Sequence, residues 1–141
     1  MGQFWWKASA PSDVDPMRTS IGGHMSCLDH ERLDVYRKSL EFLVLSDELC
    51  RQLPTGRAYL SDQLRRASLS VVLNIAEGAG EFSKAEKSRF YRMAKRSATE
   101  CAAVLDCLHM LRLGRAERAQ DGKSLLVDVV AMLIKMASRA S

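Results

Sequence analysis

The groups best suited to acid-base chemistry are two carboxylates and an amide in otherwise apolar stretches, Glu77, Glu100 and Asn74. A carboxylate pair can serve as general acid and general base when a pocket holds a substrate between them. Catalysis also needs a nucleophile or a metal and a group that orients the substrate, and the sequence places none beside the pair. We therefore favour hydrogen bonding across helices, or capping of a helix end at Gly78, and expect a protein that is not an enzyme.

Serine, cysteine and histidine offer no better reaction centre. The serines near these groups have no neighbouring histidine to act as a base, so packing of small residues is their expected role; they are Ser68, Ser70 and Ser97. The four cysteines lack the two-residue spacing of a zinc knuckle or a redox pair; they are Cys27, Cys50, Cys101 and Cys107. We expect no metal site, no cofactor and reduced thiols in the cytoplasm.

The most informative charge feature is a basic run that holds one acid, Glu86. Its cations are Lys84, Lys87, Arg89, Arg92, Lys95 and Arg96. At about 100° per residue, all of these but Lys87 spread over the helix side opposite Phe90 and Ala94. Such charge density binds phosphate backbones without base-specific geometry, and Arg65 and Arg66 add to it on the preceding helix. A solvated helix face is the alternative for an isolated patch.

Length and composition indicate one compact domain. The chain has 141 residues, of which 47% are hydrophobic and 27% charged, enough to bury a core. Its net charge of +4 favours anionic partners only mildly. No apolar run reaches the roughly 18 residues that a membrane span requires, so we expect no membrane association.

Residues 1–30 differ from the rest in composition and pattern, because they combine prolines, glycines and polar residues without a sustained hydrophobic period. We expect them to form a flexible extension outside a domain that covers residues 31–141. The run from Gly23 to Met25 has the composition of a cloning remnant, and Met17 and Met25 are alternative starts.

The remainder shows helical periodicity with three breaks, at residues 54–56, 78–80 and 114–122, which predicts four helices. The first covers residues 31–53, the second begins at Ser61, and the fourth covers residues 123–137. The third begins at Ser83, which forms a capping box with Glu86. Short connections favour antiparallel neighbours, so the expected fold is all-α, an antiparallel up-down-up-down four-helix bundle without strands.

Several of these helices are apolar on two sides. In the first helix, we expect one stripe to face the core; it contains Leu33, Tyr36, Leu40, Leu43 and Val44. In the second helix, the inward stripe contains Leu64, Ala67, Val71 and Ile75. The second faces of these two helices predict an oligomer interface, made of Val35, Phe42, Leu49, Leu69 and Leu73.

The run from Gln63 to Gly78, QLRRASLSVVLNIAEG, resembles the signature of a bacterial four-helix-bundle family. This family was first named from open reading frames in intervening sequences of large-subunit ribosomal RNA. Further positions resemble its third helix, namely Ser83, Arg89, Phe90, Ala94, Ser97 and Glu100, and its opening, namely Leu33, Val35 and Tyr36. The resemblance covers residues 33–113 clearly and the last helix loosely.

This resemblance implies an up-and-down bundle that assembles as a homopentamer. It also implies a link to nucleic acid, because one relative is the accessory variability protein of diversity-generating retroelements, a basic ring that engages a reverse transcriptase and nucleic acid. The candidate contacts are Arg65, Arg66, Arg89, Arg92, Lys95 and Arg96. We expect a non-enzymatic homopentamer that binds RNA or DNA weakly and non-specifically, or scaffolds a nucleic-acid enzyme such as a reverse transcriptase. The alternative is a protein-protein interaction module that does not bind nucleic acid.

Overall fold

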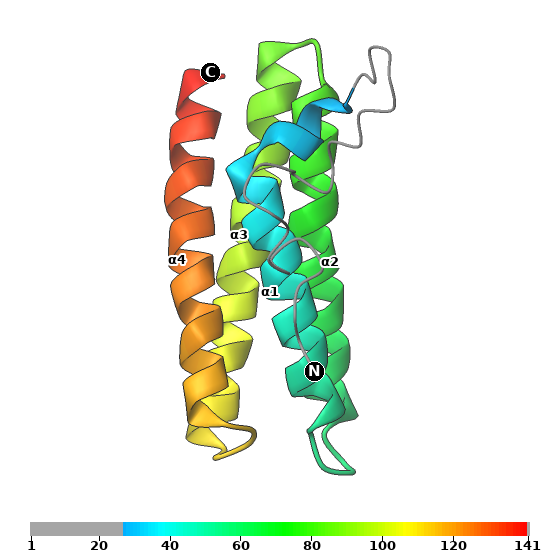
Figure 1. Ribbon diagram of the computed structural model, residues 1–141, viewed down its shortest axis with the longest axis vertical. Helices are drawn as coiled ribbons and strands as arrows, with labels where there is room; N and C mark the ends of the chain where they lie inside the picture. The colour runs from blue at the N-terminus through cyan, green and yellow to red at the C-terminus, as the bar shows by residue number, and fades with distance from the viewer. Residues whose placement is uncertain (1–26, 141) are drawn as a thin grey trace, which may run out of the picture.

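The computed structural model describes residues 27–140, and four long helices fill most of this span. A short 3-10 helix, η1 (Asp29–Arg32), precedes α1 (Asp34–Arg51), α2 (Ala58–Gly80), α3 (Lys84–Met110) and α4 (Ala116–Arg139). Each long helix packs against the next and α4 closes on α1, whereas the diagonal pairs α1/α3 and α2/α4 make no close contact. Consecutive helices run in opposite directions (Figure 1). The all-α, up-down-up-down bundle predicted from the sequence is confirmed.

The core runs along the axis of the bundle and takes one stripe from each helix. Its largest fully buried side chains include Phe42 of α1, Leu64 and Ile75 of α2, Leu105 of α3 and Leu133 of α4. The inward stripe predicted for α2 is confirmed, because all four of its residues are buried. Within the described span, no helix is long and apolar enough to cross a membrane.

The two faces predicted for α1 are reversed. Val35, Phe42 and Leu49 are each 1% exposed in the core of the protomer, so their prediction as oligomer contacts is wrong. The stripe expected to face inward is half-buried or exposed, with Val44 at 41%.

Two buried serines explain why the apolar pattern pointed to the wrong face of α1. The true inward stripe contains Ser39 and Ser46, which interrupt its apolar periodicity. Their hydroxyls donate hydrogen bonds to the carbonyl oxygens of Tyr36 at 2.6 Å and Leu43 at 2.8 Å, and Ser46 also bonds to Ser68 at 3.1 Å. Because each hydroxyl is satisfied, its burial costs little.

Two helices begin earlier than predicted. The α2 helix begins at Ala58, so the N-cap prediction for Ser61 is wrong; this buried serine lies one turn inside and donates to the Ala58 carbonyl oxygen. The α4 helix begins at Ala116 and continues through Gly122, which was predicted to lie in a break. A Cβ at Gly122 would lie 3.0 Å from a Leu45 methyl, so glycine serves close packing there.

The other predicted boundaries hold in part. At the start of α3, Ser83 accepts a hydrogen bond from the Glu86 amide at 3.4 Å, while the Glu86 carboxylate pairs with Arg89. Near the start of the described residues, η1 begins at Asp29, and the His30 ring contacts Tyr36 edge to face at 4.7 Å. The rest of the predicted extension, residues 1–26, lies outside the described residues.

Close packing between α2 and α3 makes Gly78 sensitive to substitution. A Cβ at Gly78 would lie 2.7 Å from Cε1 of Tyr91, a buried ring with little room to move. We predict that Gly78→Ala lowers the free energy of unfolding by about 1–3 kcal/mol. Gly80→Ala is the matched control, because no atom lies within 4 Å of the new methyl. Urea titration checks the difference; equal stability of the two variants would contradict this packing.

Burial separates the thiols into two classes. Cys50 and Cys101 are buried and Cys107 is exposed. Burial raises the pKa of the Cys101 thiol to about 12 and that of Cys50 above its ordinary value. In a Cys27→Ser background, we expect a thiol reagent to modify Cys107 quickly and the other two only on unfolding.

The same raised pKa values make the folded protein sensitive to alkali. The folded state keeps thiol protons that the unfolded state releases near pH 8.5, so their contribution to stability is complete below that pH. We predict that the free energy of unfolding falls as the pH rises from about 8.5 toward 12, with a smaller fall in Cys101→Ala. A pH-independent unfolding midpoint over this range would contradict the burial of these thiols.

Candidate nucleic-acid interface

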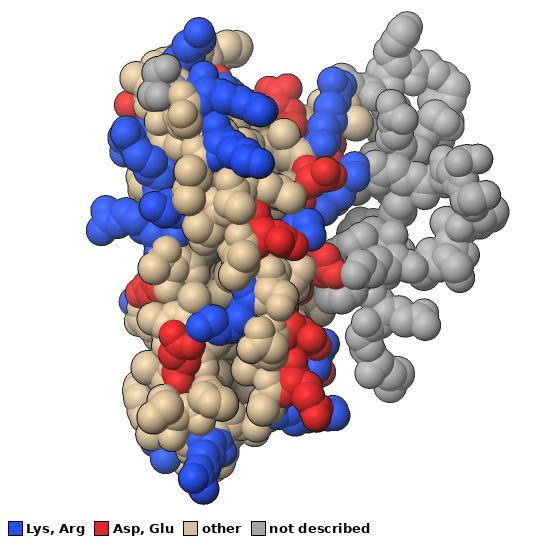
Figure 2. Space-filling view, turned by 90° about the vertical axis from the view of Figure 1, so that its left-hand side faces the viewer, with Lys and Arg blue, Asp and Glu red and all other residues tan. Residues whose placement is uncertain are grey.

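The cations predicted to contact nucleic acid lie on the outer surfaces of α2 and α3. All six are exposed, and four of them form no ion pair with any described residue: Arg66, Arg92, Lys95 and Arg96. Figure 2 looks onto the α4 side of the molecule and shows Lys and Arg gathered most densely toward the upper end, where α3 begins and α4 ends. The charge run of the sequence therefore becomes a basic face on the first half of α3.

The other two predicted cations are engaged within the protomer. Arg65 lies 3.4 Å from Asp47 of α1, a carboxylate that Arg51 also holds at 2.6 Å. The hydrogen bond from Arg51, with a further contribution from Arg65, lowers the pKa of Asp47. Arg89 pairs with Glu86 at 2.8 Å and lies over the Phe90 ring at 4.9 Å. These two cations are less available to a phosphate than the four that form no ion pair with a described residue.

Lys87 has a separate structural role within the basic run. Its ammonium group donates a hydrogen bond of 3.0 Å to the carbonyl oxygen of Ala79. This carbonyl lies in the last turn of α2, where the helix leaves acceptors without partners and where a cation interacts favourably with the helix dipole. Lys87 therefore stabilises the end of α2 beside the basic face.

A polar groove of about 380 Å³ lies between α2 and α3 next to the basic face. It is lined by Ser70, Asn74, Met93, Arg96, Ser97 and Glu100. Ser70 and Ser97 bond across the two helices at 2.8 Å, and the Asn74 amide donates to the carbonyl and hydroxyl oxygens of Ser70. Glu100 accepts a hydrogen bond from Gln63. Polar contacts thus tie α2 to α3 along this groove.

The carboxylates considered for acid-base chemistry do not meet in the groove. Glu100 lines it, but Glu77 is exposed on α2, lies outside it and forms no hydrogen bond or ion pair with a described residue. The predicted capping of a helix end by Glu77 is absent, because α2 continues past Gly78 to Gly80. Within the described residues, no three metal-ligating side chains come together.

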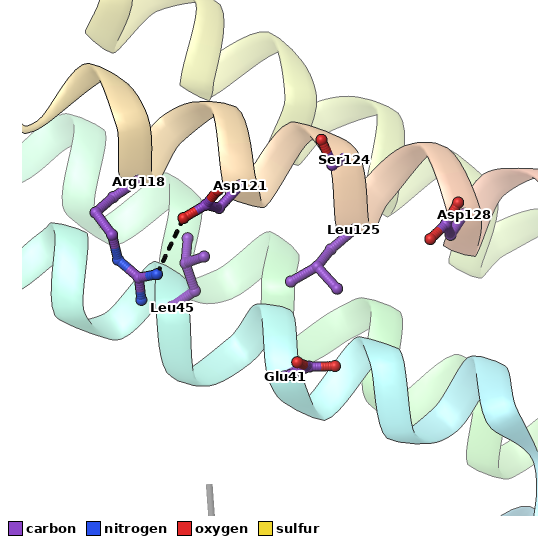
Figure 3. Close-up of a pocket in the computed structure, with 7 residues that line it drawn as sticks. All are labelled: Glu41, Leu45, Arg118, Asp121, Ser124, Leu125 and Asp128. Atoms are coloured by element: carbon purple, nitrogen blue, oxygen red, sulfur yellow. Dashed lines mark hydrogen bonds and ion pairs between the residues drawn. The ribbon is translucent and has the colours of Figure 1, made fainter. Parts of the chain in front are cut away.

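The surface between α1 and α4 combines acids with cations that pair with them. A hollow of about 330 Å³ is lined by Glu41 and Leu45 of α1 and by Asp121, Leu125 and Asp128 of α4 (Figure 3). Arg118 pairs with Glu48 at 2.7 Å and with Asp121 at 3.2 Å. Its hydrogen bond to Glu48 is the main cause of its raised pKa. Asp128 pairs with Lys38 at 3.0 Å. Cations on this side are thus engaged with acids of the same protomer, whereas Arg92, Lys95 and Arg96 of α3 form no ion pair with a described residue.

The sequence analysis missed the groove as a unit because it grouped Asn74 and Glu100 with Glu77, which lies outside the groove, and assigned Ser70 and Ser97 to packing. Gln63, Ser70 and Asn74 recur on α2 at spacings of seven and four residues, the period of one helix face. Ser97 and Glu100 lie three residues apart on the facing surface of α3. This polar periodicity was the available signal for an interhelical hydrogen-bond network.

A family model described as 23S rRNA-intervening sequence protein matches residues 31–135, a span that extends from η1 into α4. No curated protein matches the chain.

Proposed function

The chain belongs to the 23S rRNA-intervening sequence protein family, and we propose that it is a non-enzymatic homo-oligomer, a pentamer, that binds RNA or DNA through α3. The observation that carries this proposal is the basic face of Arg92, Lys95 and Arg96, which form no ion pair with a described residue. Arg66 of α2 extends it. A cation without a protein partner can neutralise a phosphate without first giving up another contact.

Binding at this face is expected to be weak and indifferent to base sequence. Three of the four cations project from the outer surface of α3 and the fourth, Arg66, from α2. Contacts of such cations with phosphates carry no sequence information. The net charge of +4 limits the affinity of one protomer. An oligomer repeats the basic face, so several weak contacts act together on one nucleic-acid chain.

A second proposed role is to scaffold a nucleic-acid enzyme such as a reverse transcriptase. Its support is the resemblance to the family's retroelement relative, together with apolar side chains exposed on α2, Leu69 and Leu73. The same exposed residues favour the alternative of a protein-interaction module without nucleic-acid binding. Recovery of one protein partner that is unaffected by nuclease treatment would favour this alternative.

We predict that the triple variant Arg92→Gln, Lys95→Gln, Arg96→Gln loses most of its affinity for a generic RNA and for duplex DNA. The slope of log affinity against log salt should fall by about one for each phosphate contact removed. Gel-shift titration at two salt concentrations, with the oligomeric state measured in parallel, checks both quantities.

The matched control removes the same charge at the other end of the bundle, through Arg51→Gln, Arg57→Gln and Arg115→Gln. These residues flank the α1/α2 and α3/α4 connections, far along the bundle from the start of α3. Affinity should stay within about twofold of the unmodified chain, apart from a small loss from net charge. Equal losses in the two triple variants, or no binding by the intact oligomer at low salt, would refute the proposed interface.

A further inference from the structure

Two helices carry exposed apolar side chains along their middle turns. On α2 these are Leu69 and Leu73, which are 46% and 53% exposed. On α4 they are Val127 and Ile134, which are 66% and 50% exposed, with the small exposed residue Ala131 between them. We call these sets the α2 stripe and the α4 stripe.

The two stripes face away from each other. The α2 and α4 helices occupy diagonal corners of the bundle and make no close contact (Figure 1). A twofold-symmetric dimer pairs one patch with itself and would leave the other stripe in water. A head-to-tail contact, in which the α2 stripe of one copy meets the α4 stripe of the next, covers both.

The two stripes match in height along the bundle. Both helices start at the same end of the bundle and run in the same direction (Figure 1). Counted from the first residue of each helix, Leu73 occupies the same position as Ala131, and Ala76 the same position as Ile134. Leu69 occupies the same position as Val127. When two copies stand side by side with parallel axes, Leu73 and Ile134 therefore each face an alanine, Leu69 faces Val127, and apolar side chains lie opposite each other at all three heights.

In the same register, an acidic residue on α2 of one copy lies opposite a basic residue on α4 of the next. Glu77 of α2 and Lys135 of α4 share one position, both are exposed, and neither forms an ion pair with a described residue. Arg65 and Lys123 also share a position, but each cation pairs with an acid of its own copy, Asp47 and Asp106 respectively. The register thus brings an unpaired acid to an unpaired base without opposing two unpaired like charges.

We propose that copies of this chain associate head to tail, with the α2 stripe of one copy on the α4 stripe of the next in this parallel register. The inference rests on the homo-oligomer proposed above and specifies its two faces. It leaves α3 uncovered between neighbouring copies, so Arg92 and Lys95 repeat along the assembly. Head-to-tail contacts of this kind close into a ring when the rotation between copies permits.

A mixing experiment tests the proposal. Variant A carries Leu69→Asp and Leu73→Asp, and variant B carries Val127→Asp and Ile134→Asp. Each variant alone should be a monomer by light scattering, while an equimolar mixture should form a dimer with one copy of each. The dimer forms because A keeps an intact α4 stripe and B an intact α2 stripe, and it stops growing because the remaining faces are disabled.

A control variant and the possible results distinguish a failure of the head-to-tail contact from a failure of the proposed oligomer. Val44→Asp places a charge at an exposed apolar site of α1 and should leave the assembly intact. Suppose that the unmodified chain assembles. If variants A and B then do not pair on mixing, or if either variant alone still self-associates, the head-to-tail contact is overturned and the oligomer is not. A monomeric unmodified chain overturns both the contact and the oligomer.

Charge reversal provides a second test that leaves the apolar residues in place. Glu77→Lys alone and Lys135→Glu alone should each raise the dissociation constant between copies by about fivefold. The double variant should recover the original value, because the reversed pair meets again across the contact. No recovery, with helicity unchanged by circular dichroism, contradicts the parallel register.

Discussion

Each helix can bury only one stripe inside the protomer, and the remaining surface features follow from this constraint. In a bundle where a helix contacts only its two neighbours, the opposite side of that helix faces solvent. On α4, Val129 and Leu133 are fully buried while Ile134 is half-exposed. Apolar side chains on α2 and α4 therefore remain exposed to water after the four described helices have packed together, which favours association between copies.

The same arrangement of helices determines which cations are paired with acids and which are not. Salt bridges between α1 and its neighbours pair the cations on that side of the molecule with carboxylates. Examples are Lys38 with Asp128 at 3.0 Å and Arg118 with Glu48 at 2.7 Å. The outer surface of α3 contains few acids, so Arg92, Lys95 and Arg96 keep their charge unpaired among the described residues. Assembly through α2 and α4 would leave Arg92, Lys95 and Arg96 of α3 available to nucleic acid, whereas Arg66 lies on α2 at helical spacing from Leu69 and Leu73 and so beside the contact between copies.

Sequence patterns predicted the four helices and the α2 core stripe because apolar residues there recur at an uninterrupted helical period. They reversed the faces of α1 because Ser39 and Ser46, buried with their hydroxyls bonded to the backbone, look polar in a sequence. Gly122 was mistaken for a break because only the packed structure shows its close approach to Leu45. The charge run identified the basic face, but which cations are already paired depended on contacts between helices.

The mass of the unmodified chain in solution, measured by light scattering at tens of micromolar protein, tests the central claim most directly. We expect a mass several times that of one chain, with five copies for the closed ring. A mass equal to that of a single chain would mean that the exposed leucine, valine and isoleucine side chains are tolerated in water, and it would contradict the assembly on which the proposed function depends.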